Sequence, residues 1–373
     1  MFIDVHILQS VPPSNINRDD TGSPKTALFG GTRRARVSSQ AWKRATRKRF
    51  NDTLDRSDIG VRTRKLAELL GEKITECAPD IGAEDANTLA SKVFTDAGIK
   101  MTPPKVKKGE DKKPDESGYL VFLSRGQLEV LAESAVESHR SGEALDKKKL
   151  KSIINSDNSI DVALFGRMIA DDAELNVDAA VQVAHAISVQ AVEQEFDYFT
   201  AVDDFQEDKN ETGAGMIGTI EFNSSTLYRY ATLNVGGLAH NLGDAAATAR
   251  AAAAFVEAFS RSMPTGKQNT FANRTLPEAV VVCVRTDQPV NLVGAFEDAV
   301  IPSIEEGAVS IATKRWVARH SEIASVYGSP GETYYAAVGT AAAALDGVGE
   351  SLAFPDLVAR VESTVTSELS ASV

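Results

Sequence analysis

The residues with the clearest chemical potential form one strongly basic block near the start of the chain. Between residues 33 and 49 the sequence carries eight Lys or Arg and no Asp or Glu, whereas the whole chain has 40 basic and 52 acidic residues and a formal net charge of −12. Each Arg can direct two N–H groups onto phosphate oxygens. Eight like charges repel one another unless an anion binds them, so the block predicts a phosphate-binding site. A solvated helix face is the alternative.

The residues that flank the block suit the same chemistry. The glycines at 30–31 would let the backbone approach a ligand closely. Ser38 or Ser39 would cap a helix that runs to about residue 50, and the amino end of a helix attracts anions. On that helix Trp42 and Ala45 would pack inward. The polar face would carry residues at the i, i+3, i+4 and i+7 spacing, namely Gln40, Lys43, Arg44 and Arg47.

The elements that must position this block are read from hydrophobic periodicity. We expect a first strand at 2–10, a long loop at 11–37, the basic helix, and mostly helix over 51–100. Further on we expect a strand at 118–124, helices at 125–140 and 145–155, an extended hairpin at 193–222, a strand at 225–238, a helix at 243–263 and a strand at 278–286. This order favours an α+β core of the split βαβ or ferredoxin-like type with inserted subdomains. Many such cores bind single-stranded RNA on a sheet face.

Composition places the chain among ordinary globular proteins, with 43% hydrophobic and 25% charged residues. No apolar run is long enough to cross a membrane, and the first residues lack the features of a signal peptide. Residues 101–117, rich in Pro and Lys, read as a disordered surface insertion. Cys77 and Cys283 are expected to be free thiols, which favours the cytoplasm.

Several sequence blocks, taken in order, resemble a known family. They are Ile16-Asn17-Arg18-Asp19-Asp20, the stretch from Phe29 to Gln40, the stretch from Ile160 to Met168, the residues around His185, and those at 197–204, 218–231 and 266–272. Together they resemble the backbone subunit (CasC family) of the type I-E CRISPR Cascade complex. A single block would be a weak signal, but these cover nearly the whole chain.

The resemblance implies a hand-shaped subunit. An RRM-like or ferredoxin-like palm would comprise residues 1–56 and 223–373, a helical fingers insertion residues 57–190, and a protruding β-hairpin thumb residues 191–222. Copies would multimerise head-to-tail along a CRISPR RNA, kink it at regular intervals and present it for pairing with target DNA, together with other Cascade subunits. The resemblance also implies a protein that needs no metal or cofactor and does not cut nucleic acid.

Carried over residue by residue, the resemblance and the basic block together give a set of guide-RNA contacts. The phosphate contacts would be Arg18, Lys25, Arg33, Arg34, Arg36, Ser38, Gln40, Lys43, Arg44 and Arg47. Lys267, in a polar loop, would contact RNA or the neighbouring subunit. Met168 would wedge against bases. In the thumb, Tyr198, Phe199, Thr200 and Val202 would interrupt base stacking at a displaced nucleotide, a stack worth about 1–3 kcal/mol. Ordinary core packing is the alternative for the two aromatic residues.

A second basic cluster opens the helix expected at 145–155. In the family, lysines here are similar to ones that grip target duplex DNA, so the implied DNA contacts are Lys147, Lys148, Lys149 and Lys151. A solvated helix face is the alternative. Contacts of this kind would be salt-dependent and blind to sequence.

Three other functions compete with this interpretation. Asp19 and Asp20 beside the basic block could serve metal-dependent cleavage of RNA, although an ion pair that orders the loop is the simpler use. A P-loop NTPase is disfavoured because the glycine that should precede Gly266-Lys267 is absent. The histidines show no zinc-ligand spacing. A pure protein scaffold would leave the basic block unexplained.

Overall fold

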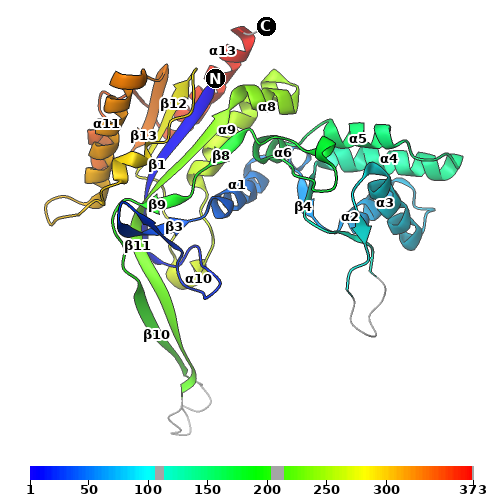
Figure 1. Cartoon of the computed structure of the whole chain (residues 1–373), viewed down its shortest axis with the longest axis horizontal. Coiled ribbons are helices and arrows are strands. Elements are labelled where there is room, and N and C mark those ends of the chain that lie inside the picture. Colours follow the sequence, from blue (N-terminus) through cyan, green and yellow to red (C-terminus); the bar gives the residue numbers. More distant parts are fainter. Residues whose placement is uncertain (106–112, 203–213, 372–373) are drawn as a thin grey trace. The chain divides into compact units, whose positions relative to one another are not determined.

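The computed structural model describes residues 1–105, 113–202 and 214–371. The chain divides into two compact units (Figure 1). Unit 1 comprises Met1–Arg49, Val183–Thr232 and Ala253–Thr364, and unit 2 comprises Phe50–Gln182, Leu233–Ala252 and Val365–Val373. Unit 2 thus takes in 233–252 and 365–373, which sequence reasoning assigned to the palm.

A mixed sheet forms the centre of unit 1. Its strand order is β14-β13-β12-β1-β11-β9-β3-β2, and β8 and β10 also pair with β11. Strands β13 and β14 run parallel, whereas β1 and β12 pair antiparallel from Phe2 opposite Arg285 to Leu8 opposite Ala279. The strands are β1 (Phe2–Ser14), β2 (Thr26–Phe29), β3 (Thr32–Val37), β8 (Val181–Val183), β9 (Ala186–Ser188), β10 (Glu195–Val202), β11 (Ala214–Asn234), β12 (Ala279–Arg285), β13 (Glu332–Ala337) and β14 (Glu350–Ser351).

Helices pack against this sheet and confirm the expected α+β class. Residues 3–9 of β1 are all buried, so both faces of the strand are covered. The helices lying wholly or partly in unit 1 are α1 (Ser39–Thr53), α9 (Ala245–Arg261), α10 (Gln268–Phe271), α11 (Ala308–Tyr327), α12 (Gly339–Ala344) and α13 (Phe354–Ala371), with a 3-10 turn at Leu292–Phe296. Helix α11 contributes Trp316 to the core of one face.

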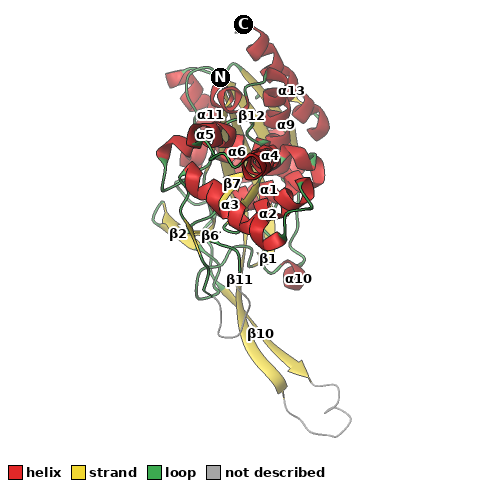
Figure 2. Cartoon of the chain, turned by 90° about the vertical axis from the view of Figure 1, so that its right-hand side faces the viewer, coloured by secondary structure: helices red, strands yellow, loops and turns green. Residues whose placement is uncertain are grey.

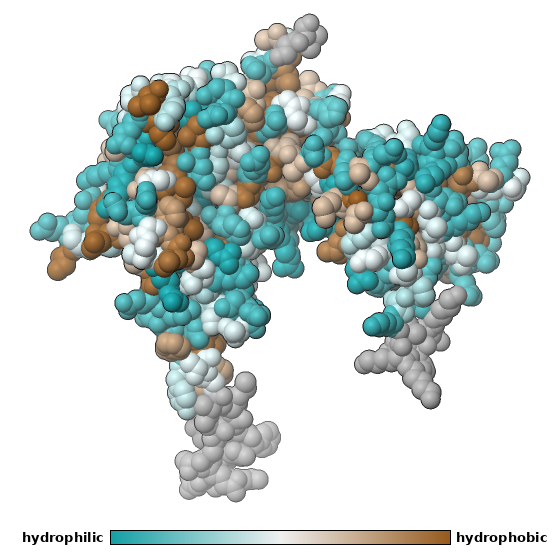
Figure 3. Space-filling view, in the orientation of Figure 1, coloured by the Kyte–Doolittle hydropathy of each residue, from teal (hydrophilic) through white to brown (hydrophobic). Residues whose placement is uncertain are grey.

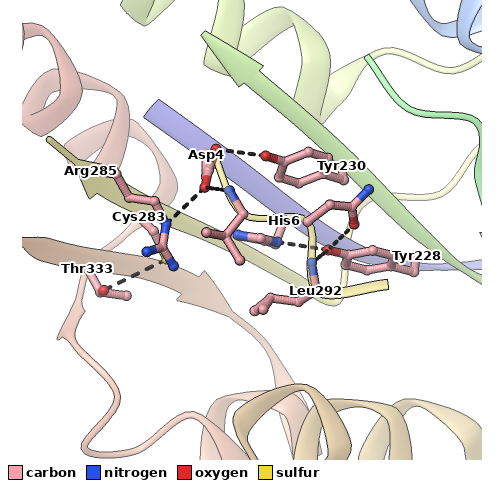
Figure 4. Close-up of polar contacts among 10 residues, drawn as sticks. Asp4, His6, Tyr228, Tyr230, Cys283, Arg285, Leu292 and Thr333 are labelled. Carbon is pink, nitrogen blue, oxygen red and sulfur yellow. Dashed lines mark hydrogen bonds and ion pairs between the residues drawn. The ribbon is translucent and has the colours of Figure 1, made fainter. Parts of the chain in front are cut away.

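A buried polar cluster ties β1 to its neighbours (Figure 4). The Asp4 carboxylate accepts from Tyr230 at 2.9 Å and pairs with Arg285 at 3.1 Å. His6 hydrogen-bonds the Tyr228 hydroxyl at 2.9 Å. Because the His6 ring is fully enclosed, burial holds its pKa well below 6.5, with smaller contributions from nearby cations.

The long loop expected at 11–37 is wrong in its second half. Strands β2 and β3 form a hairpin there, with Phe29 opposite Thr32. The turn consists of Gly30 and Gly31, whose φ angles are 56° and 73°, as a two-residue hairpin turn of type I′ requires.

Strands β10 and β11 form a second, longer hairpin. The pairs run from Glu195 opposite Phe222 to Val202 opposite Ala214, with a bulge near the far end. The two strands extend away from the rest of the sheet as a narrow ribbon (Figures 1 and 2). The predicted hairpin at 193–222 is therefore present in the described residues, while 203–213 lie outside them.

Unit 2 is mainly helical. Its core includes Leu66, Leu70, Phe94 and Leu131. The helices that lie in unit 2 are α2 (Leu66–Cys77), α3 (Ala83–Ala97), α4 (Arg125–Ser141), α5 (Lys147–Asn155), α6 (Ile160–Phe165) and α8 (Val235–Leu242), in addition to the parts of α1, α9 and α13 that extend into it. Its short strands form two pairs, β4 (Val61–Thr63) with β7 (Val121–Leu123) and β5 (Met101–Thr102) with β6 (Glu116–Ser117). The residues 106–112 of the predicted disordered insertion lie outside the described chain.

None of the helices in the described parts of the chain is long and apolar enough to cross a bilayer.

Candidate nucleic-acid interface

Helix α1 is held in unit 1 by an aromatic and cationic stack. Trp42 is fully buried, and the Arg229 guanidinium lies 3.7 Å from the centre of its ring. Phe259 of α9 meets the same ring edge-on at 6.5 Å. Ser38 caps the helix, because its Oγ accepts from Ala41 N at 3.3 Å. The inward face predicted from the sequence is confirmed, so the opposite face of α1 is the one turned to solvent.

The loop before β2 is bound to the start of α1. Asn17 Oδ1 accepts from Ser38 N at 2.8 Å, and Lys25 N donates to Asn17 O at 2.9 Å. Asn15, which is buried, donates from Nδ2 to Gly22 O and to Glu221 O, both at 2.9 Å. One amide therefore joins this loop to the root of the β10–β11 hairpin.

Three cations of the block and two of the loop before β2 remain available at the surface of unit 1. Arg18, Arg33 and Arg44 are exposed and Lys25 and Lys43 are half-buried. None of these five makes an ion pair with any residue that the structure describes. We call them the free cations. Partial burial lowers the pKa of Lys43 because it removes water from the ammonium group.

The other predicted contacts around α1 have distinct environments. Gln40 is exposed, Arg47 is half-buried, and Ser38 is almost buried because it caps the helix. Lys267 is half-buried and adopts φ 50° in a tight loop whose Gly266 packs against the backbone of Ile16. Left-handed backbone in a residue other than glycine is uncommon and clusters at functional sites.

His185 lies at the same edge and was not predicted as a contact. Its Nδ1 is 3.3 Å from Arg36 Nη1 and 3.4 Å from Ser39 N. Burial, then Arg36 and Lys25, lower its pKa below 6.5. Two donors facing Nδ1 hold the ring neutral with its proton on Nε2.

Arg34 is a correction to the predicted set. Its side chain is fully buried, and its two terminal nitrogens donate to the carbonyl oxygens of residues 188, 189, 296 and 297 at 2.9–3.1 Å. Its Nε donates to Thr32 Oγ1 at 2.7 Å. With its donors used inside the fold, Arg34 stabilises the edge of the sheet and is not kept as an RNA contact.

The β10–β11 hairpin presents two different faces. Residues opposite each other in the register share a face, so Tyr198 lies with Phe196 on one side and Phe199 with Phe222 on the other. Phe196 and Tyr198 are 65% and 64% exposed. Phe199 instead packs against Gly218. Alternation along the strand could have identified Phe196, two residues before Tyr198.

The other two predicted thumb contacts, Thr200 and Val202, also lie on β10. Thr200 is exposed. Val202 is the last described residue of β10. Near the root of the hairpin, Phe222 packs on Phe271 of α10 with ring centres 5.8 Å apart.

The predicted wedge residue Met168 and the predicted lysine cluster belong to unit 2. Met168 is 77% exposed, just after α6. On α5, Lys147 and Lys148 are exposed, while Lys149 pairs with Glu137 at 3.4 Å. Lys151 is a correction, because its ammonium lies 2.6 Å from both Asp172 and Glu174 and is neutralised within the fold.

Asp19, the first residue of the acidic pair beside the block, orders its own loop. Asp19 Oδ1 accepts from Thr21 N at 2.9 Å and from Ser23 N at 3.0 Å. These bonds, with that from the Thr21 hydroxyl, lower the pKa of Asp19. Asp20 is exposed. Among residues 1–105, 113–202 and 214–371, no group of three or more His, Cys, Asp or Glu side chains is arranged to hold a metal ion.

Known proteins resemble this chain over nearly all of its length. It is similar to a chain of a "CRISPR RNA-guided surveillance complex, pre-nicking", with 35% identity, a TM-score of 0.85, and coverage of 98% of this chain and 100% of the other. It is also similar to a chain of a "CRISPR RNA-guided surveillance complex", with 30% identity, a TM-score of 0.77 and the same coverage. No curated protein matches it. The family model described as CT1975-like protein, a Cas family, matches residues 3–360. The chain therefore belongs to the CT1975-like protein family of CRISPR-associated proteins.

Proposed function

We propose that this protein is a non-catalytic backbone subunit of a type I-E CRISPR surveillance complex. It binds guide RNA, multimerises head-to-tail along it, kinks it at regular intervals and presents it for pairing with target DNA. The observation that carries the proposal is the set of free cations around α1 in a chain with a net charge of −12. Uncompensated cations destabilise a fold unless a polyanion neutralises them.

The geometry of α1 supports binding along a phosphate backbone. Lys43 and Arg44 lie about one turn beyond the helix amino end, where Ser39 N and Arg36 Nη1 both face Nδ1 of His185. A helix amino end and flanking cations suit successive phosphates. Such contacts are independent of base identity, as a subunit that holds any guide requires.

Exposed apolar side chains support contacts between copies. Leu28, Ile301 and Ile304 are each more than three-quarters exposed. Brown side chains gather at the end of the loop before α11 in Figure 3. The root of the hairpin also borders a groove of about 570 Å³ lined by Val192, Glu195 and Ile301. Large exposed apolar residues mark surfaces that another protein covers, here a second copy or another Cascade subunit.

The hairpin suits the role of a thumb. It projects from unit 1 and carries two exposed aromatic rings, Phe196 and Tyr198, on one face. Aromatic rings compensate the loss of a base stack, worth about 1–3 kcal/mol per base. These rings would interrupt base stacking at a displaced nucleotide. The proposal places the protein in the cytoplasm, where Cys77 and Cys283 would stay the free thiols that they are.

RNA co-purification tests this function. Expressed with its neighbouring genes, the protein should retain RNA of one defined length. RNA of random length, or none, would contradict the proposal.

Metal-dependent cleavage through Asp19 and Asp20 is the alternative. Purified protein incubated with magnesium and complementary RNA should leave the RNA intact. Cleavage that disappears with Asp20→Ala would establish the alternative.

A further inference from the structure

A small pocket in unit 1 is lined in part by Lys25, one of the free cations, and has no assigned role. Half of its lining residues are apolar, among them Val11, Val37 and Leu227. The polar ones come from β1, the 15–25 loop, β3 and β11, namely Ser14, Asn17, Lys25, Arg36, Asn223 and Ser225. The space that the centre of a water molecule can reach inside it is about 20 Å³. One water molecule needs about 10–15 Å³ of such space. The pocket therefore admits one or two atoms and excludes a nucleobase.

Asn223 supplies the second observation. This residue is 8% exposed, and its Nδ2 has no hydrogen-bond partner among the residues that the structure describes. A buried donor left unpaired costs about 1–3 kcal/mol. Because Asn223 also lines the pocket, an oxygen atom bound there is a suitable acceptor for this donor.

The charge of the lining identifies the kind of acceptor. Lys25 and Arg36 both contribute to the wall, and no Asp or Glu does. Arg36 Nε donates to Thr26 O at 3.3 Å and its Nη1 lies 3.3 Å from His185 Nδ1, so the position of the guanidinium group is fixed. Cationic and amide donors around a space for one or two atoms favour the binding of an oxygen atom, either an anionic oxygen or a hydroxyl.

We propose that this pocket receives a single oxygen of the ribose-phosphate backbone, which accepts a hydrogen bond from Asn223 Nδ2 and lies between Lys25 and Arg36. The proposal rests on the RNA-binding function proposed above. It adds Asn223, at the root of the hairpin, to the RNA contacts. Either a phosphate oxygen or a ribose 2′-hydroxyl has this chemistry.

The test measures binding of the full-length protein to a labelled single-stranded RNA, and to DNA of the same sequence, by fluorescence anisotropy. Asn223→Ala removes the donor without changing charge, so affinity should fall about tenfold while the dependence on salt stays the same. Asn223→Asp places a negative charge in the pocket and should weaken binding further. Asn87→Asp, the same change in unit 2, should have no effect. Should Asn223→Asp fail to fold in a thermal melt, Asn223→Ala alone decides.

The two nucleic acids distinguish the two sources of oxygen. A phosphate oxygen predicts equal losses for RNA and DNA, and a 2′-hydroxyl predicts a loss for RNA alone. If both Asn223 variants bind RNA as the wild type does while Lys43→Ala/Arg44→Ala weakens binding, the pocket assignment is overturned and the RNA-binding function stands. If the wild type binds neither nucleic acid, both are overturned.

Discussion

Removing two free cations from α1 should reduce both the RNA affinity and its dependence on salt. Lys43 and Arg44 make no ion pair with any part of the chain that the structure describes, so each charge is available for a phosphate. For a single-stranded nucleic acid, the slope of log affinity against log salt becomes shallower by about 0.7 for each phosphate contact removed. Lys43→Ala/Arg44→Ala should therefore make the slope of log affinity against log salt shallower by about 1.4.

That change of slope converts into a measurable difference. Between about 50 and 200 mM salt, the wild type should lose about sevenfold more affinity than the double variant. Titrations followed by the anisotropy of a labelled single-stranded RNA at four salt concentrations would give both slopes. Thermal melting should show that the variant stays folded, because Arg44 is exposed, Lys43 is half-buried and the fully buried Trp42 is unchanged.

A matched pair controls for net charge. Arg62→Ala/Lys92→Ala removes one arginine and one lysine from exposed positions of unit 2. This control should leave the slope unchanged. Equal slopes for wild type and the α1 variant, or an equal change in the control, would refute the reasoning that local charge holds the RNA.

Three further predictions concern the hairpins and the core. Replacing Tyr198–Thr219 by Gly-Gly, which closes the β10–β11 ribbon with a two-residue turn, should leave a folded monomer that no longer forms long RNA-bound assemblies in electron micrographs. In urea titrations, Gly30→Ala should destabilise the protein more than Gly31→Ala. Both positions have a positive φ, which costs a residue with a Cβ about 1–2 kcal/mol. A Cβ at position 30 would also lie 1.6 Å from a backbone oxygen, whereas a Cβ at position 31 meets no atom. At pH values below about 6.5, the unfolding free energy should decrease by up to about 1.4 kcal/mol per pH unit, because His6 binds a proton in the unfolded chain but not in the buried site. His6→Phe should flatten this dependence. His139→Phe, at an exposed position, should leave it unchanged.

Each of these has an outcome that contradicts it. Long filaments from the shortened ribbon would show that it does not join copies. Equal stability of the two alanine variants would mean that the turn does not pack as described. Burial also lowers the pKa of His320, which accounts for a smaller residual slope in the His6→Phe variant. A slope equal to that of the wild type in His6→Phe would contradict the third prediction.

Helices were predicted well because their periodicity is local. The expected helices at 125–140, 145–155 and 243–263 correspond to α4, α5 and α9 within a few residues. The β2–β3 hairpin was missed because its strands are short and its second strand carries three arginines, which hide any apolar alternation. Its Gly30-Gly31 turn was interpreted as part of a loop.

The site was predictable in its chemistry but not in its details. Arg34 and Arg36 look alike in the sequence, yet the carbonyls that bind Arg34 come from residues more than 150 positions away. Lys151 meets Asp172 and Glu174 across a turn of chain that periodicity does not describe. Asn223 gave no signal, because only the folded chain reveals a buried donor without an acceptor.

The side-chain amide of Asn15 has a consequence for genetics. Because it supports the Arg18 loop and the base of the ribbon with the same two hydrogens, a change at this position disturbs both places together. A screen for defects in guide retention and a screen for defects in assembly would therefore both return Asn15, although its buried side chain faces neither a nucleotide nor another subunit.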